Sequence, residues 1–134
     1  MKMAQTFRVK ILTLDKVVFD GDVEKLFTKS DSGEIEVLHN YAPSIISTVP
    51  CCTKLVLEDG TVIKVFTSNG IINVQNNKLN FCCESSELSQ DIDINRAKAS
   101  KERAERRLSK DGYDVERAEL SLLKANIRIS ISEQ

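Results

Sequence analysis

Hydrophobic and polar residues alternate with a period of two through much of residues 1–88, which is the pattern of half-buried β-strands. In the first run, Phe7, Val9 and Ile11 alternate with Arg8 and Lys10. Further short apolar runs follow, separated by Gly, Pro, Asp or Asn, at 17–19, 23–27, 35–38, 45–49, 55–57, 62–66, 71–74 and 79–83. About nine to ten short strands at this spacing predict an all-β sandwich or flattened barrel.

Two of the connections have the composition of tight hairpin turns. Asp59 and Gly60 lie between the apolar runs 55–57 and 62–66, and Asp-Gly supplies the backbone angles that such a turn needs. Asn76 and Asn77 lie between the next two runs, and asparagine tolerates the left-handed region. After the first strand, Leu12 and Leu14 change phase, which predicts that the strand becomes fully buried or bulged.

Near residue 90 the strand pattern gives way to helix composition. Residues 91–110 are rich in Ala, Lys, Glu and Arg and contain neither Gly nor Pro. Asp93 stands where a helix N-terminus accepts an acidic residue, and Asp111 with Gly112 is expected to end this helix. Asp114 then begins a second helix with an apolar residue at every third or fourth position. These positions are Val115, Ala118, Leu122, Ala125 and Ile129.

The sequence therefore predicts a β-sandwich domain over residues 1–88 and an antiparallel helical hairpin over residues 89–134. The apolar stripe of the first helix is thin and consists of Ala97, Ala104 and Leu108. At about 25 cal/mol per Å² of buried apolar surface, an alanine-lined seam contributes little stability. We therefore expect the hairpin to be held weakly and to be able to open.

Composition narrows the range of functions. With 19 Lys and Arg against 20 Asp and Glu, the net charge of −1 argues against a protein that mainly wraps nucleic acid. Charge is nevertheless concentrated locally, because residues 95–110 hold seven basic residues against two acidic ones. The basic residues are Arg96, Lys98, Lys101, Arg103, Arg106, Arg107 and Lys110. This excess indicates an acidic partner, with a merely solvated helix face as the alternative.

Candidate catalytic and metal-binding residues are scarce. The chain has one histidine, His39, and its four cysteines form the adjacent pairs Cys51-Cys52 and Cys82-Cys83, without CxxC spacing. Neighbours on a strand point to opposite faces, so we expect reduced thiols acting as small apolar residues, with redox sensitivity as the alternative. No phosphate-binding loop and no membrane-spanning apolar segment occur in the sequence. We predict no catalytic residue, no metal site and a cytosolic chain.

Several stretches, in this order and spacing, resemble the epsilon subunit of bacterial F-type ATP synthases. In the sandwich these are Ser-Gly-Glu-Ile-Glu-Val-Leu at 32–38 and Ala-Pro at 42–43. In the helices they are Asp-Ile-Asp-Ile-Asn-Arg-Ala at 91–97, Lys-Glu-Arg-Ala-Glu-Arg-Arg-Leu at 101–108 and Arg-Ala-Glu-Leu at 117–120. The resemblance covers nearly the whole chain. It departs from the family at His39, Asn40 and Tyr41, where Pro-Gly-His is usual.

The resemblance implies a non-catalytic subunit of the central stalk. Such a subunit couples the catalytic head to the ion-translocating c ring during rotary ATP synthesis and hydrogen ion transport. Its expected partners are the gamma subunit, the c-subunit ring and the alpha and beta subunits, and its expected location is peripheral, at the cytoplasmic face of the bacterial membrane without a span. The sandwich would attach to gamma and the c ring, and the mobile hairpin would inhibit ATP hydrolysis. The implied inhibitory contacts are Arg103, Arg106, Arg107, Lys124 and Arg128.

The resemblance also implies a nucleotide site. Some family members bind ATP on the folded hairpin through an Ile/Leu-Asp-x-x-Arg-Ala motif, which residues 92–97 fit. No cofactor is required, and regulatory ATP, with or without magnesium, is the ligand that this similarity implies. The corresponding residues are Glu87, Ile92, Asp93, Arg96, Ala97, Arg103, Lys124 and Arg128. In the alternative interpretation Asp93 only caps the helix, and Arg96 pairs with it or with the sandwich.

Two other classes of function remain open from the sequence. One is a small adaptor that binds nucleic acid or another acidic partner through the basic helix. The other is a sandwich enzyme that uses a cysteine or His39, which requires a thiolate within reach of a base. A steep loss of affinity with salt would distinguish the adaptor, and sensitivity to thiol-blocking reagents would distinguish the enzyme.

Overall fold

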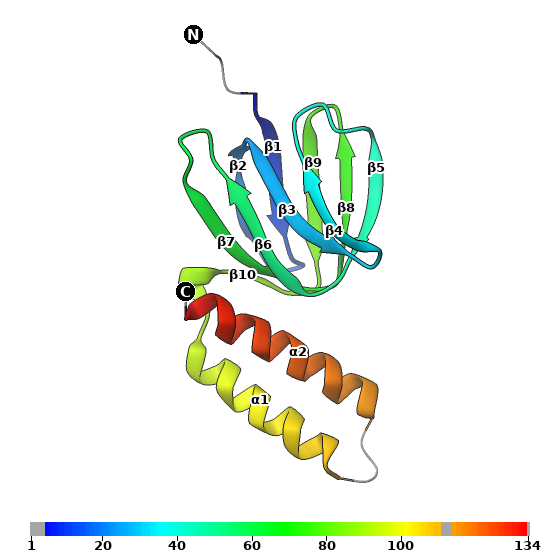
Figure 1. Cartoon of the computed structure of the whole chain (residues 1–134), viewed down its shortest axis with the longest axis vertical. Coiled ribbons are helices and arrows are strands. Elements are labelled where there is room, and N and C mark those ends of the chain that lie inside the picture. The colour runs from blue at the N-terminus through cyan, green and yellow to red at the C-terminus, as the bar shows by residue number, and fades with distance from the viewer. Residues whose placement is uncertain (1–4, 111–113, 134) are drawn as a thin grey trace.

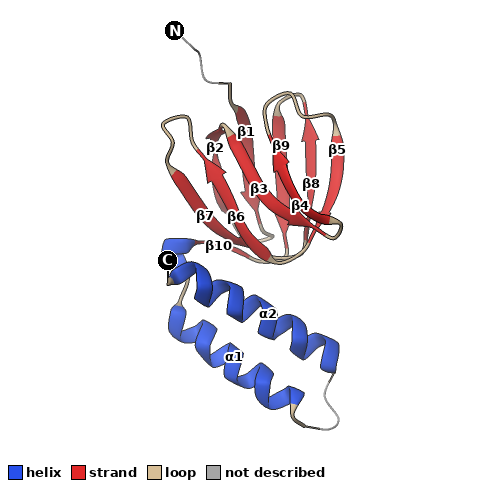
Figure 2. Cartoon of the chain, in the orientation of Figure 1, coloured by secondary structure: helices blue, strands red, loops and turns tan. Residues whose placement is uncertain are grey.

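A computed structural model describes residues 5–110 and 114–133 of the chain (Figure 1). The strands are β1 (Phe7–Leu12), β2 (Val17–Val23), β3 (Lys25–Ser30), β4 (Gly33–Val37), β5 (Ser44–Thr48), β6 (Cys51–Val56), β7 (Val62–Thr67), β8 (Gly70–Gln75), β9 (Lys78–Cys83) and β10 (Ser86–Leu88). A 3₁₀ turn, η1 (Ser89–Asp91), leads to the helices α1 (Ile94–Leu108) and α2 (Val115–Ser132). The predicted fold class, a sandwich followed by a helical hairpin, is confirmed (Figure 2).

The strands form one sheet that folds back on itself. Its order is β10-β7-β6-β3-β5-β8-β9-β1-β2, with β4 paired to β3, and of these pairs only β1 with β9 is parallel in the described residues. The strands β3 and β5 share a single residue pair, Ser30 with Thr48, which is where the two halves of the sandwich meet. Alternate residues such as Val9 and Ile11 point inward and are completely buried. The predicted period of two therefore builds one closed core.

Both predicted hairpin turns are confirmed. Gly60 has a φ of +90°, which a side chain would make costly, and it lies between β6 and β7. Asn76 and Asn77 have φ values of 54° and 59° between β8 and β9. Asn40, in the loop that departs from the family pattern, has a φ of 59° as well. Its backbone N–H donates to Asn77 Oδ1 (2.6 Å) and Asn77 Nδ2 donates to Asn40 Oδ1 (3.0 Å), so the loop is tied to the β8–β9 turn.

The phase change after the first strand is confirmed as a bulge, since the β1–β2 register shifts between Ile11 and Leu12, and Leu14 is fully exposed in the turn that follows. One position of the predicted apolar stripe in the second helix was wrong. Val115 is 52% exposed, so the buried stripe of α2 begins only at Ala118. The predicted helix end at Asp111 and Gly112 lies outside the described residues.

Each helix of the hairpin begins at the aspartate that its sequence predicts. Asp93 Oδ1 accepts the backbone N–H of Arg96 (3.1 Å), and Asp114 Oδ1 accepts that of Arg117 (3.2 Å), so each carboxylate caps a helix. The buried residues between the helices are alanines, namely Ala97, Ala104, Ala118 and Ala125. Small side chains allow close approach, and each of them buries little apolar surface.

Candidate functional site

The C-terminal half of α2 lies against the sandwich, below the outer face of β6 and β7 (Figure 1). Phe66 of β7, Ile92 and Ile131 form a buried cluster, and Cys52 and Ile127 pack against it. Cys52 and Phe66 are paired across β6 and β7, which places both side chains on the same outer face. We call these five residues the docking cluster. It is small, so apolar burial alone holds the hairpin to the sandwich only modestly.

Arg128 adds a polar contact beside the docking cluster. Its Nε donates to Glu87 Oε1 at 3.0 Å, and its Nη2 donates to Ser85 Oγ at 3.5 Å. The guanidinium carbon lies 4.2 Å from the centroid of the Phe66 ring, which is cation–π geometry. The Arg128 and Glu87 side chains are only 22% and 26% exposed, so water and salt screen the pair less than a surface ion pair.

A second ion pair is weaker. Lys124 Nζ lies 3.8 Å from Glu84 Oε1, and the Glu84 side chain is 69% exposed. Such a pair contributes on the order of 0–1 kcal/mol. Arg128 is therefore the main electrostatic contact between α2 and the sandwich, and Lys124 assists it.

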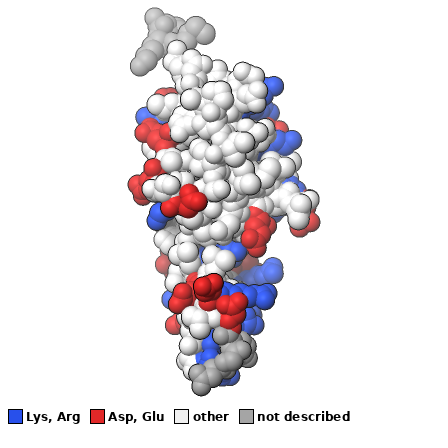
Figure 3. Space-filling view, turned by 90° about the vertical axis from the view of Figure 1, so that its right-hand side faces the viewer, with Lys and Arg blue, Asp and Glu red and all other residues white. Residues whose placement is uncertain are grey.

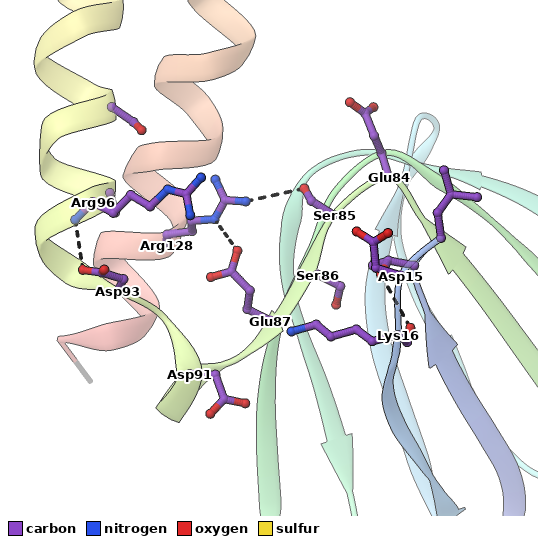
Figure 4. Close-up of a pocket in the computed structure, with 14 residues that line it drawn as sticks. Asp15, Lys16, Glu84, Ser85, Ser86, Glu87, Asp91, Asp93, Arg96 and Arg128 are labelled. Carbon is purple, nitrogen blue, oxygen red and sulfur yellow. Dashed lines mark hydrogen bonds and ion pairs between the residues drawn. The ribbon is translucent and has the colours of Figure 1, made fainter.

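A cavity of about 590 Å³ lies between the hairpin and the sandwich, beside Arg128 (Figure 4). Its walls are the β1–β2 turn, the β9–β10 connection and the first turns of α1. The carboxylates that line it are Asp15, Glu84, Glu87, Asp91 and Asp93, and the cationic residues are Lys16, Arg96 and Arg128. The volume is in the range of small-molecule sites. The carboxylates outnumber the cations by two, so the cavity carries a negative surplus.

The structure brings together five of the residues that the family motif indicated for nucleotide binding. These are Glu87, Asp93, Arg96, Ala97 and Arg128, all of which line the cavity. Ile92 is instead buried in the docking cluster, and Lys124 does not line the cavity, although its partner Glu84 does. Arg103 does not line the cavity itself, but its Nη2 donates to Oγ of the lining residue Ser100 at 3.0 Å.

One part of the cavity wall was not indicated as a site by any pattern in the sequence. Thr13, Leu14, Asp15 and Lys16 form the β1–β2 turn, about 80 residues before the helices along the chain. Only the closure of the sheet, which places β1 beside β9, brings this turn to the end of the sandwich that faces α1.

The residues indicated for inhibitory contacts fall into two groups. Arg103, Arg106 and Arg107 are exposed on α1, whereas Lys124 and Arg128 are held at the sandwich. A space-filling view shows Lys and Arg gathered on one side of the hairpin with Asp and Glu beside them (Figure 3). Only the first group is free to meet an acidic partner while the hairpin is folded.

The structure gives little support to an enzyme that uses a cysteine or His39 in catalysis. Burial raises the pKa of the Cys83 thiol to about 12, and it also raises the pKa of Cys52, so both thiols stay protonated at neutral pH. His39 Nε2 lies 3.1 Å from Asn40 Nδ2, in the connection between β4 and β5. Within residues 5–110 and 114–133, no three His, Cys, Asp or Glu side chains are grouped as metal ligands. None of the helices in these ranges has the length and hydrophobicity to cross a bilayer.

Comparison with known proteins identifies the family. The model of the ATP synthase delta/epsilon chain β-sandwich domain matches residues 6–89, and that of the delta/epsilon chain long α-helix domain matches residues 90–133. The chain therefore belongs to the family of ATP synthase delta and epsilon chains. The ATP synthase epsilon chain of Clostridium botulinum (strain Eklund 17B) is 42% identical over 98% of both chains. That of Desulforamulus reducens is 37% identical over 98% of this chain and 100% of its own.

These relatives confirm the prediction of an epsilon subunit of an F-type ATP synthase and favour it over the adaptor and the enzyme. A chain in the Euglena gracilis mitochondrial ATP synthase superposes with a TM-score of 0.69 at 16% identity, covering 98% of this chain and 79% of that one. A chain in the central stalk and c ring of the Tetrahymena thermophila mitochondrial ATP synthase superposes with a TM-score of 0.62 at 12% sequence identity. The superposition covers 98% of this chain and 99% of that one. At such identities the likeness shows the fold alone.

Proposed function

We propose that this chain is the coupling and inhibitory subunit of the rotary central stalk. The sandwich holds the gamma subunit and the ring of c subunits, and the hairpin regulates ATP hydrolysis. The chain itself is non-catalytic, since catalysis belongs to the alpha and beta subunits, and it works as a peripheral component at the cytoplasmic face of the bacterial membrane. The observation that carries the proposal is the division of a family member into a closed sandwich and a weakly docked cationic hairpin.

The attachment face is the outer side of β5, β8, β9, β1 and β2. Strand register aligns Ile71 with Cys82, Cys82 with Leu12 and Leu12 with Val17 in one row without a charge. Ile71 and Val17 are 54% and 51% exposed, and the neighbouring Ile45 is 78% exposed. The opposite outer face carries Lys25, Lys29, Lys54, Glu34 and Glu36. An exposed apolar row of this kind is what a protein partner covers, and gamma is that partner.

The exposed arginines of α1 supply the inhibitory contact. In the folded hairpin Arg103, Arg106 and Arg107 face solvent, and in the extended form they meet acidic residues of the alpha and beta subunits. Undocking of α2 requires that the small docking cluster, the Arg128 contact and the exposed Lys124–Glu84 pair separate. All three are weak enough to be exchanged for a larger interface.

Replacement of Arg103, Arg106 and Arg107 by alanine is expected to weaken inhibition of ATP hydrolysis about tenfold. Each exposed charge contributes roughly 0.3–1 kcal/mol to such a contact, and three removed together amount to about that factor. The measurement is a titration of the assembled catalytic head with the variant while ATP hydrolysis is followed. A matched control replaces Lys25, Lys29 and Lys54 of the sandwich, which removes the same charge elsewhere. Equal inhibition by both triple variants would contradict the electrostatic contact.

The cavity beside Arg128 is the site of regulatory ATP. Arg96 and Arg128 offer guanidinium donors to phosphates, and Asp93 and Glu87 offer acceptors to the adenine or ribose. Because carboxylates outnumber cations in the lining, the magnesium complex of ATP fits better than the more highly charged free nucleotide. Bound there, ATP would bridge the start of α1 and the sandwich and so favour the folded hairpin.

Replacement of Arg96 by alanine is expected to weaken ATP binding roughly tenfold, because it removes a charge-assisted donor to phosphate. Calorimetric titration of the full chain with ATP and magnesium measures the effect. Lys98 lies two residues away on α1 but outside the cavity lining, and its replacement by alanine serves as the control. If the parent chain shows no ATP binding at millimolar concentration, the nucleotide part of the proposal is wrong.

A further inference from the structure

The three cations that line the cavity differ in what they contact. Arg128 donates to Glu87 and Ser85. The Arg96 guanidinium and the Lys16 ammonium, in contrast, make no ion pair or hydrogen bond with any group of residues 5–110 and 114–133. Arg96 belongs to the first turn of α1 and Lys16 to the β1–β2 turn (Figure 4). Two cations without a partner therefore line the cavity, one on the hairpin side and one on the sandwich side.

The backbone of the β1–β2 turn holds Lys16 at the cavity and leaves its side chain free. The Thr13 backbone N–H donates to the Lys16 carbonyl at 2.9 Å, and Thr13 Oγ1 donates to the same oxygen at 3.5 Å. Because β1 and β9 are parallel, the residues that follow the two strands meet at the same end of the sandwich. Figure 4 shows the Lys16 side chain extending from the turn towards Glu87. Lys16 is exposed, so an anion can reach its ammonium without displacing a protein contact.

Most of the carboxylates in the lining already interact with another group. These interactions are Glu87 with Arg128, Glu84 with Lys124 and Asp93 with the first turn of α1. The two carboxylates that remain, Asp15 and Asp91, equal in number the two cations without a partner. The lining is therefore close to neutral once these interactions are counted, and an anion that reaches both cations gains charge-assisted hydrogen bonds.

We propose that Lys16 is a phosphate-binding residue of the nucleotide site and supplies from the sandwich the cation that Arg96 supplies from α1. This inference rests on the regulatory ATP site proposed above and adds to it a residue that the family motif does not indicate. The ligand class is a nucleoside polyphosphate, because a chain of phosphates can contact cations on two walls of a cavity at once. An ammonium on a flexible stem suits this contact, since it needs no fixed orientation to the phosphate.

Lys16 gives the bound nucleotide a hold on the sandwich. In the part of the chain that the structure describes, no side chain of α1 makes a hydrogen bond or an ion pair with the sandwich, and the polar contacts of the hairpin come from α2. A polyphosphate held by Arg96 and Lys16 adds a polar link between α1 and the sandwich. The nucleotide thereby opposes separation of the hairpin, which a ligand bound to the helices alone would not do.

Calorimetric titration of the full chain with ATP and magnesium tests the role of Lys16. Lys16→Gln should weaken ATP binding roughly three- to tenfold, because it removes one charge-assisted contact to phosphate. Lys16→Arg retains the positive charge and should bind ATP within about twofold of the parent. The matched control is Lys78→Gln, which removes the charge of an exposed lysine at the start of β9, outside the cavity lining. Its ATP affinity should equal that of the parent.

The outcomes separate the role of Lys16 from the nucleotide site on which it rests. If the parent binds ATP and Lys16→Gln binds it as tightly as Lys78→Gln does, Lys16 is no phosphate ligand, while the site itself stands. If Lys16→Arg loses as much affinity as Lys16→Gln, the positive charge is not what binds ATP, and the proposal is overturned as well. A parent chain that binds no ATP at millimolar concentration overturns both the site and the role of Lys16.

A labelling experiment on the same proteins tests the link to the sandwich. Cys52 packs in the docking cluster, so its reaction with a maleimide reports how often α2 moves away, and tandem mass spectrometry separates it from Cys51. One concentration of ATP with magnesium, well above the dissociation constant of the parent, should slow labelling in the parent and in Lys78→Gln. The slowing should be roughly three- to tenfold smaller in Lys16→Gln, in proportion to its affinity. Equal slowing in Lys16→Gln, or ATP binding that leaves labelling of the parent unchanged, would overturn the link.

Discussion

A chain truncated after Ser89 is expected to remain bound to the catalytic head and to lose its inhibition of ATP hydrolysis. The truncation removes α1 and α2 but leaves every strand, because β10 ends at Leu88. The sandwich core is formed by strand residues alone, so it should stay folded. The rate of ATP hydrolysis by the head should rise to the level without the subunit, which is a several-fold to tenfold change if inhibition is strong.

The truncation uncovers the surface on which α2 packs, and a control variant tests whether that exposed apolar surface affects the result. Removal of α2 exposes Phe66 and Cys52, and a variant of the truncated chain with Phe66→Ser keeps that surface polar. Both truncated chains should co-elute with the head and fail to inhibit. Full inhibition by a truncated chain that still binds would place regulation in the sandwich and contradict the proposed division of roles.

Replacement of Ile71 by aspartate is expected to weaken attachment to gamma about ten- to hundredfold. Ile71 stands in the uncharged row on the outer side of β8, and a carboxylate there would be buried without a partner when gamma covers it. The exposed side chain is not part of the core, so the free energy of unfolding of the isolated chain should hardly change. Affinity for a gamma-containing head, measured by calorimetry, is the test.

Val62 provides the matched control for Ile71. It is 50% exposed, nearly as much as Ile71, but lies on β7 in the other half of the sandwich. Val62→Asp should leave the affinity for gamma within a factor of two or so, since surface substitutions away from an interface have small effects. If the two variants bind equally well, gamma attaches to a different face.

Local features of the chain could be predicted from the sequence because their causes are local. Alternation determines which side of β1 is buried, Gly60 and Asn77 determine turns through their own backbone angles, and Asp93 caps the helix three residues away. Errors arose where a residue's environment depends on its neighbours in space. Val115 fits the apolar stripe, yet it is 52% exposed at the start of α2.

The candidate site was predictable only in part for the same reason. The family motif indicated Asp93 and Arg96, which line the cavity, but also Ile92, which the docking cluster buries. The pairing of Arg128 with Glu87 spans 41 residues, and each of these residues has several possible partners in the sequence. Sheet closure and the docking of α2 decide which partner is reached, and neither follows from periodicity.

The sandwich and the hairpin are held by contacts of different strength, so one chain can have a rigid part and a movable part. The sandwich closes a core of completely buried side chains from nearly every strand. The hairpin is held by an alanine seam, five residues of the docking cluster and two ion pairs of which one is mostly exposed. A partner that binds the open hairpin has to exceed only the second set of contacts, and the sandwich stays intact meanwhile.

In the proposed function the hairpin must leave the sandwich in order to inhibit, and a covalent lock between α2 and the sandwich tests this requirement. Ile127→Cys places a second thiol in the docking cluster with Cys52, once Cys51, Cys82 and Cys83 are replaced by alanine. A short cleavable thiol cross-linker then joins α2 to β6. We predict that the cross-linked chain binds the catalytic head without inhibiting ATP hydrolysis and that cleavage of the linker restores inhibition. Inhibition by the cross-linked chain as strong as that of the uncross-linked one would contradict it.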